Sequence, residues 1–183
     1  QMCIRDSSYT GYLNKKVCSY ECNLTSGSWS PYRYAFPIIR LADLYLMYAE
    51  ALNEVKDSPD DEVYRYVDLV RERAGLEGVV DSWGKYSINP DKPMTQGGMR
   101  QIIRNERLNE LAGEGRRFWD LRRWKQDLPS EVRGWNIKGQ SAQEFYRVTT
   151  LYRRTKYSYK DYLWPLKVSS LLKNPNLVQN PGW

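Results

Sequence analysis

Histidine is absent from the 183 residues of this chain. It is the usual general base of enzymes and the commonest metal ligand in proteins. Its absence excludes a histidine-dependent catalytic triad and removes the most frequent donor for a metal site. We therefore expect neither a metal site nor histidine-dependent catalysis.

Cysteines and long hydrophobic runs are also scarce. Of three cysteines, Cys18 and Cys22 lie four positions apart without other soft ligands nearby, so a zinc site is not expected. These two thiols either pair, if the protein works in an oxidising compartment, or remain independent. No apolar run approaches the length of a membrane-spanning helix, although 41% of the residues are hydrophobic. The composition is typical of a globular domain.

Helical periodicity dominates what is present. After Pro37, which suits the first turn of a helix, apolar residues recur at steps of three and four as far as Glu54. Ser58, Asp60 and Asp61 are expected to supply N-terminal caps and favourable dipole charge for a second helix, which runs to Ala74 and ends at Gly75. Two helices joined by a short loop predict an antiparallel hairpin of the tetratricopeptide type. The fold class expected is all-α, predominantly helical with long irregular loops.

The rest of the chain is expected to hold two further helices within irregular structure. The expected helices cover residues 99–112 and 115–126, the expected connections are 8–36, 77–98 and the segment after Pro129, and one short helical turn is expected after Val168.

Two glutamates occupy unexpected positions in the helix predicted from residue 99. Glu106 and Glu110 continue the face that begins with Met99, while Leu108 and Leu111 lie on the opposite face. A helix that is apolar on two sides is expected to be buried on both sides. Buried carboxylates need partners, so both glutamates are expected to be paired.

The two glutamates could be read as the acid pair of a glycoside hydrolase or as part of an ion-pair network. A hydrolase needs one carboxyl group to stay protonated near neutral pH. The next helix is rich in arginine, which favours the ionised form of both glutamates. We therefore predict a structural network of Glu106, Glu110, Arg117 and Arg123 in a protein that is not an enzyme.

Five segments, in this order along the chain, carry a family resemblance. They are Pro37–Glu54, Val70–Leu76, Arg104–Trp124, Tyr162–Leu166 and Asn174–Trp183. Their sequences resemble the C-terminal portion of the SusD/RagB family, the glycan-binding lipoproteins of Bacteroidetes outer membranes. The first two segments are similar to a tetratricopeptide-like helix pair of that family, and the third is similar to its most recognisable block.

The resemblance implies non-enzymatic capture of an oligosaccharide or polysaccharide at the extracellular face of the outer membrane, with no catalytic residues and no cofactor. It implies delivery of that glycan to a SusC-like TonB-dependent transporter. It also implies that membrane attachment depends on a lipid anchor in an N-terminal half that this chain lacks. The alternative that remains open is a helical tetratricopeptide-like scaffold for protein–protein interaction.

The first seven residues are expected to be foreign to the domain. Met2–Ser7 is what the end of a common transposon-based sequencing adapter encodes in one frame. We therefore expect residues 1–7 to be an adapter translation and residues 8–183 to be the C-terminal portion of a SusD/RagB-like domain.

Aromatic residues outside the predicted helices are the candidate ligand-binding residues, because aromatic rings can stack on the faces of sugars. They are Trp83 and Tyr86, followed by Trp29 and Tyr32. Trp83 is favoured because polar residues flank it and Gly84 permits a turn. The alternative is that each ring packs only on its own loop.

The segment after Pro129 is rich in both aromatic and basic residues, a pattern that also occurs in single-stranded nucleic-acid binders. A pI of about 9.2 and a net charge of +6 agree with that reading. However, acidic residues are spread throughout the chain, and no RRM, KH or zinc signature occurs. We therefore expect no nucleic-acid partner.

Overall fold

The computed structural model divides the chain into two compact units. One unit spans Val17–Arg117 and the other holds Phe118–Trp183. The side chains of strand residues 23–25 and 28–30 are not described. The structure describes residues 16, 19, 21–25, 28–30, 32, 37–127, 130–153 and 158–183.

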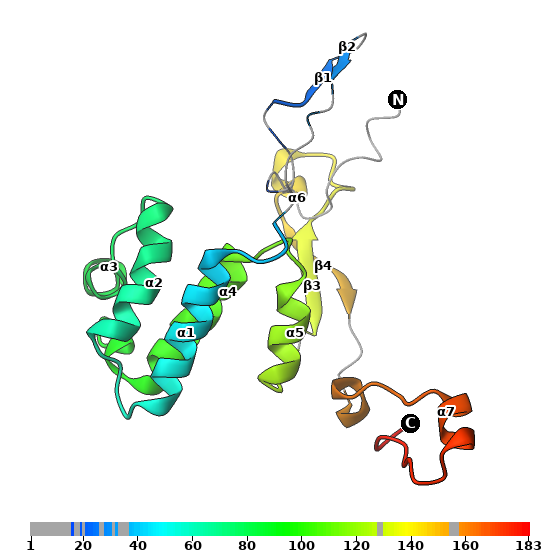
Figure 1. The fold of residues 1–183 in the computed structure, drawn as a ribbon. Helices are drawn as coiled ribbons and strands as arrows, with labels where there is room; N and C mark the ends of the chain where they lie inside the picture. The colour runs from blue at the N-terminus through cyan, green and yellow to red at the C-terminus, as the bar shows by residue number, and fades with distance from the viewer. Residues whose placement is uncertain are drawn as a thin grey trace. The chain divides into compact units, whose positions relative to one another are not determined.

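The predicted helical hairpin is present in the first unit. Helix α1 (Leu41–Val55) packs against both α2 (Asp61–Arg73) and α4 (Gln96–Glu110) (Figure 1). The side chain of Asp60 caps α2 by accepting a hydrogen bond from the Val63 amide. The sequence thus located both helices, and Asp60 is one of the three cap candidates that it offered.

Helix α1 begins later than predicted. Pro37 was expected in its first turn, but the helix starts at Leu41 with Arg40 as its N-cap. Ile38 and Ile39 are 83% and 66% exposed, so helical structure at these positions would not be stabilised by burial of their side chains.

Residues 77–98 are not the irregular connection that the sequence predicted. They contain α3 (Val79–Tyr86) and the short 3₁₀ helix η2 (Lys92–Met94). The first turn of α3 is held by Asp68 of α2, whose Oδ1 accepts a hydrogen bond of 2.7 Å from the Val79 amide. This cap comes from another helix, so local sequence patterns could not show it.

One hydrophobic core joins the four α-helices of this unit. Its members are apolar side chains that are at most 4% exposed. They are Leu46 and Ala49 from α1, Val63, Val67 and Val70 from α2, Val79 from α3, and Met99, Ile102 and Ile103 from α4. The core explains the helical periodicity and gives α3 a fixed place against α2.

The prediction for the second face of α4 was wrong for Leu108 and confirmed for Leu111. Leu108 is 41% exposed, and Leu111, just beyond the helix, is buried. Within the helix itself, the buried side chain beyond Ile103 is Arg107. The helix is therefore buried along one apolar face that ends in an arginine.

Beyond Gly115 the chain continues with α5 (Arg116–Arg123), which is close to the predicted helix 115–126. The irregular structure expected after Pro129 is partly wrong. Strand β3 (Glu131–Trp135) pairs antiparallel with β4 (Val148–Arg153), and α6 (Ala142–Phe145) lies between them.

Two features of the sequence favour the β3–β4 hairpin. Its second strand contains Val148-Thr-Thr-Leu-Tyr-Arg, a run of residues that favours strands. Trp135, Phe145 and Tyr146 form an aromatic cluster with ring centroids 5.2–5.7 Å apart. This cluster packs the connection against the end of β3.

Short elements complete the two units. In the first unit, β1 (Asn23–Thr25) pairs antiparallel with β2 (Ser28–Ser30), where irregular structure was expected. In the second, η3 (Tyr159–Tyr162) precedes α7 (Val168–Lys173), the predicted short helical turn.

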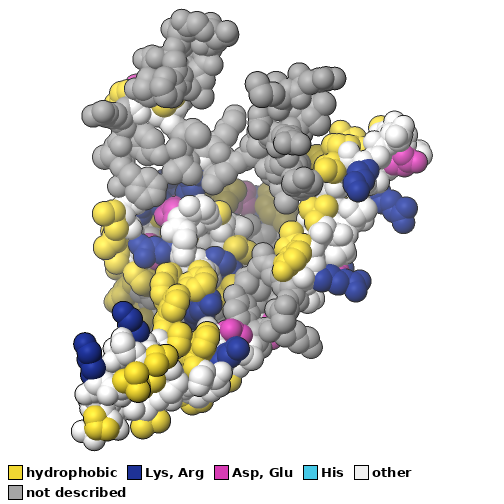
Figure 2. Space-filling model, turned by 90° about the vertical axis from the view of Figure 1, so that its right-hand side faces the viewer, with side chains coloured by type: hydrophobic (Ala, Val, Ile, Leu, Met, Phe, Trp, Pro, Cys, Tyr) yellow, Lys and Arg dark blue, Asp and Glu magenta, His cyan; other side chains and the backbone are white. Residues whose placement is uncertain are grey.

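Large hydrophobic side chains remain exposed in both units. Figure 2 shows several groups of them on one face of the molecule, interspersed with Lys and Arg. On α1, Leu41, Leu44, Met47 and Tyr48 are 41–59% exposed. Exposed apolar patches are typical of surfaces that contact another protein or segment. None of the helices in the described part of the chain is long and apolar enough to span a bilayer.

Candidate functional site

Trp83 and Tyr86, the favoured candidates from the sequence, lie on α3 and not in a loop. Residues three apart on a helix share a face. Trp83 is half-buried against the hydrophobic core, whereas Tyr86 is 73% exposed. With Ser82 and Ser87, the two rings line a shallow depression of about 300 Å³. The structure therefore brings these two candidates together.

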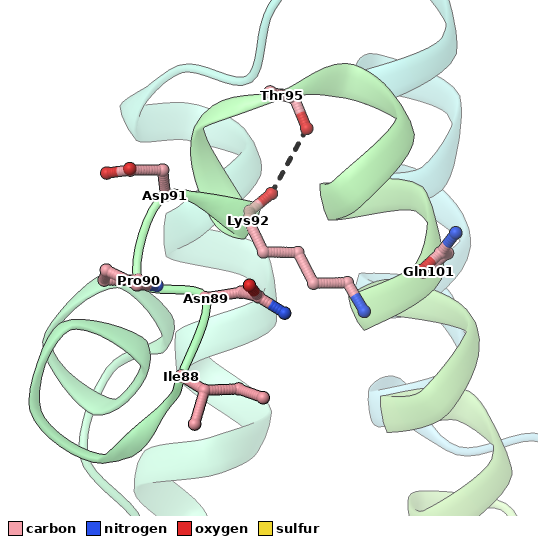
Figure 3. Close-up of a pocket in the computed structure, with 7 residues that line it drawn as sticks. All are labelled: Ile88, Asn89, Pro90, Asp91, Lys92, Thr95 and Gln101. Atoms are coloured by element: carbon pink, nitrogen blue, oxygen red, sulfur yellow. Dashed lines mark hydrogen bonds between the residues drawn. The ribbon is translucent and has the colours of Figure 1, made fainter.

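A larger hollow of about 550 Å³ continues from the end of α3. It lies among the loop after α3, η2 and the exposed side of α4 (Figure 3). Lys92 extends toward α4 and the Asn89 amide points the same way, while Asp91 points away from them. The lining residues are Ile88, Asn89, Pro90, Asp91, Lys92, Thr95 and Gln101.

Lys92 links the two depressions. Its Nζ lies 5.0 Å from the centroid of the Trp83 ring, within the range of a cation–π contact. We call the surface formed by Trp83, Tyr86, Asn89, Lys92 and Gln101 the α3–η2 surface. It combines aromatic rings with amide and ammonium donors, which is the chemistry that a polyhydroxylated ligand requires.

The frame of this surface is tightly packed. Tyr64 of α2 donates a hydrogen bond of 3.1 Å to the Pro93 carbonyl. Thr95 caps α4 by accepting a hydrogen bond from the Gly98 amide at 3.1 Å. A Cβ atom on Gly98 would lie 2.0 Å from the Lys92 carbonyl oxygen, so only glycine fits. The residues of the surface are therefore held by close packing of η2 against α2 and α4.

The charges around the surface are partly compensated. Lys85 forms an ion pair with Glu77 at 2.7 Å, and this carboxylate raises the pKa of Lys85. Burial raises the pKa of Asp68, although its bond from the Val79 amide opposes that rise. Within the part of the chain that the structure describes, no three carboxylate or thiol side chains are grouped to hold a metal ion.

Trp29 and Tyr32, the other two candidates, belong to the region before α1. Trp29 lies in β2 opposite Leu24, and its side chain is outside the described residues. Tyr32 is 51% exposed, and its amide donates to the Cys22 sulfur at 3.3 Å. Cys22 carries a free thiol, and Cys18 lies outside the described residues.

Glu106 and Glu110 are substantially buried, with side chains 15% and 12% exposed. Glu106 forms an ion pair with Arg71. Glu110 forms ion pairs of 2.7 Å with Arg40 and with Arg73. These arginines come from α2 and from the residue before α1.

The ion pairs described for the two glutamates are with arginines other than Arg117 and Arg123, and pairing with these two stays a prediction. Arg123 donates to Asp120 within α5 at 2.9 Å. The glutamates project from the side of α4 that faces α2, so arginines of the hairpin reach them.

A second buried network was missed. Asp43 of α1 and Arg107 of α4 have side chains only 5% and 3% exposed, and Arg107 Nη1 lies 2.9 Å from Asp43 Oδ1. Arg116 approaches the other carboxylate oxygen at 3.2 Å. The available signal was spacing, since Arg107 follows Met99 and Ile103 at steps of four on the buried face.

Comparison with known proteins identifies the family. A model described as "SusD family" matches residues 2–183. The chain belongs to the SusD family. This confirms the resemblance seen in the sequence, and the helical fold agrees with it.

Individual relatives support this assignment. SusD-like protein P2 of Formosa agariphila is 36% identical over 146 residues, which are 79% of this chain and 25% of that protein. SusD-like protein P25 of the same organism is 40% identical over 87 residues, covering 48% of this chain and 15% of that protein. The solved structure named BT4246 matches with a TM-score of 0.64 and 32% identity, over 87% of this chain and 25% of that chain. The SusD-family chain thus spans a quarter or less of the length of these relatives.

Proposed function

We propose that this chain is the C-terminal part of a non-enzymatic protein that captures oligosaccharides at the outer face of the bacterial outer membrane. The observation that carries this proposal is the match of the SusD family model to residues 2–183. The captured glycan passes to a SusC-like TonB-dependent transporter, and a lipid anchor provides attachment to the membrane.

The α3–η2 surface is the part of this chain that we propose contacts the glycan. The exposed Tyr86 ring offers an apolar face to the C–H groups of a sugar ring. Asn89, Gln101 and Lys92 supply donors on the adjoining hollow for hydroxyl groups. Trp83 connects the surface to the interior, because its ring is partly buried against the hydrophobic core.

A protein-interaction scaffold is the second candidate, and the exposed side of α1 favours it. Leu41, Leu44, Met47 and Tyr48 are 41–59% exposed there, as in a surface that packs against another protein or another part of the same one. The two functions are compatible, since a protein that delivers cargo to a transporter also needs protein contacts.

Glycan binding is tested by calorimetric titration of the protein with defined hexasaccharides: malto-, cello-, laminari- and xylohexaose. We expect at least one of them to bind, and Tyr86→Ala to weaken that binding roughly tenfold, or about 1.4 kcal/mol. Tyr86 is 73% exposed, so its removal is expected to leave the fold intact.

Tyr152→Ala is the matched control, since Tyr152 is 61% exposed on β4. It is expected to bind as the parent does. Trp83→Phe keeps a ring in the core and should bind within about threefold of the parent. If Tyr86→Ala and Trp83→Ala both bind the hexasaccharide as tightly as the parent, the glycan does not bind at the α3–η2 surface.

The proposed transporter partner is tested by the gene neighbourhood in the source DNA. We expect a SusC-like gene beside this one and glycoside hydrolase genes nearby. A neighbourhood without any transporter gene would count against delivery to a SusC-like partner.

A further inference from the structure

The C-terminal residues are fixed onto η3 in the second unit. The indole N–H of Trp183 donates to the carbonyl oxygens of Lys160 and Leu163, each at 3.1 Å. Gly182 adopts a φ of +88°, and a Cβ atom there would lie 2.9 Å from Lys160 Cβ. The terminal tryptophan is therefore held in one orientation.

The segment that follows η3 is tied to the same C-terminal residues. The Asn180 amide donates to the Trp164 carbonyl at 2.6 Å. The side chain of Gln179 accepts from the Leu166 amide at 2.8 Å and donates to the Leu166 carbonyl at 3.1 Å. Backbone groups of 163–166 are thus fixed while the adjoining rings stay at the surface.

A hollow of about 230 Å³ lies beside η3 and the C-terminal residues, and we call it the C-terminal pocket. Two of its walls are the rings of Trp164 and Trp183, which remain 65% and 51% exposed. Lys160 Nζ lies 5.2 Å from the centroid of the Trp183 ring, so a cation faces part of that ring. Large apolar rings that stay partly exposed beside a hollow are typical of ligand sites. The lining residues are Arg122, Asp161, Leu163, Trp164, Pro165 and Trp183.

The two charged residues of the pocket are also held in place. The Arg122 guanidinium stacks on Phe118, 3.4 Å from the ring centroid, and donates to the Phe118 carbonyl. Asp161 Oδ2 accepts hydrogen bonds from the amide and the hydroxyl of Ser158. The Ser158 amide lowers the pKa of Asp161, so this carboxylate stays ionised at neutral pH.

We propose that the C-terminal pocket binds one residue of a neutral pyranose sugar. Trp164 and Trp183 would stack on the C–H faces of the sugar ring, Asp161 would accept hydrogen bonds from its hydroxyls, and Arg122 would donate to them. The guanidinium has five N–H donors, so it keeps its bond to Phe118 while binding a hydroxyl.

The charge of the pocket favours a neutral sugar. The lining itself holds one cation and one anion, so an acidic sugar would gain from Arg122 and lose against Asp161, and Lys160 lies beside the lining against the Trp183 ring. The volume of about 230 Å³ is below the range of roughly 300–1,000 Å³ typical of sites for drug-sized ligands, which fits a single ring. The pocket is a separate contact from the α3–η2 surface, and neither depends on the other.

The test is a nuclear magnetic resonance titration of the ¹⁵N-labelled protein, followed through the tryptophan indole N–H signals. The probes are the methyl glycosides of glucose, galactose, mannose and xylose. We expect at least one to shift the Trp164 and Trp183 signals saturably, with a dissociation constant on the order of 1–10 mM. No saturable shift of either signal with any probe at about 100 mM overturns the proposal.

Variants separate this pocket from the α3–η2 surface. Trp164→Ala is expected to weaken the binding seen at Trp183 at least about tenfold, and Trp164→Phe to restore it within about threefold. Tyr152→Ala is the control and should leave the titration unchanged. Parent-like binding by Trp164→Ala, or shifts confined to the Trp83 signal, overturns this proposal, and the second result supports the α3–η2 surface instead.

Discussion

Replacing Arg107 by alanine is expected to lower the free energy of unfolding by about 3–5 kcal/mol. Asp43, its partner in α1, is almost fully buried, and the ion pair joins α1 to α4 across the core. Removing the arginine leaves a buried carboxylate with Arg116 as its other close cation. Urea denaturation of both proteins measures the difference.

The Glu54–Arg100 pair is the matched control, since it also links α1 to α4 but lies near the surface. Its side chains are 41% and 31% exposed, so Arg100→Ala should cost less than about 1 kcal/mol. If Arg107→Ala costs no more than Arg100→Ala, the buried pair does not hold the two helices together. The double variant Asp43→Asn with Arg107→Met should recover part of the loss.

Gly98→Ala is expected to destabilise the protein by about 3 kcal/mol and to disturb the α3–η2 surface. The added methyl group would lie 2.0 Å from the Lys92 carbonyl oxygen and 2.7 Å from the Thr95 hydroxyl. The clash is with backbone, so η2 must move away from α4 to relieve it. Thermal unfolding measures the stability, and hexasaccharide titration measures the effect on the surface.

The neighbouring Gly97 provides the control within the same helical turn. A Cβ atom on Gly97 would meet no heavy atom within 4 Å. Gly97→Ala is therefore expected to raise the stability by about 0.5–1 kcal/mol, because alanine restricts the unfolded chain and favours helix. A Gly98→Ala protein as stable as Gly97→Ala would show that η2 does not pack closely on α4.

The features that the sequence predicted correctly each lie within a single helix. The apolar steps in α1, α2 and α4 predicted three helices, and the polar residues Ser58, Asp60 and Asp61 predicted the start of one of them. Burial of Glu106 also followed from the apolar face that it continues. These features depend on helical periodicity, which a sequence carries directly.

The candidate site was predicted in part. Trp83 and Tyr86 were selected as aromatic residues of a loop, and the structure keeps them together on a helix face instead. The adjoining donors of Asn89, Lys92 and Gln101 were not selected, because sequence alone does not show that the segment before η2 lies beside α4. Packing of η2 on α4 places them beside the rings.

Membership of the SusD family, helical class and the amphipathic faces of the long helices were determined by the sequence itself. Tertiary structure alone decided that Glu106 pairs with Arg71 of α2 and that Asp68 of α2 caps α3. The physical reason is the same in both cases. A buried charge or an unpaired helix end is satisfied by whichever group the packed core brings within hydrogen-bond distance, and distance along the chain does not determine that group.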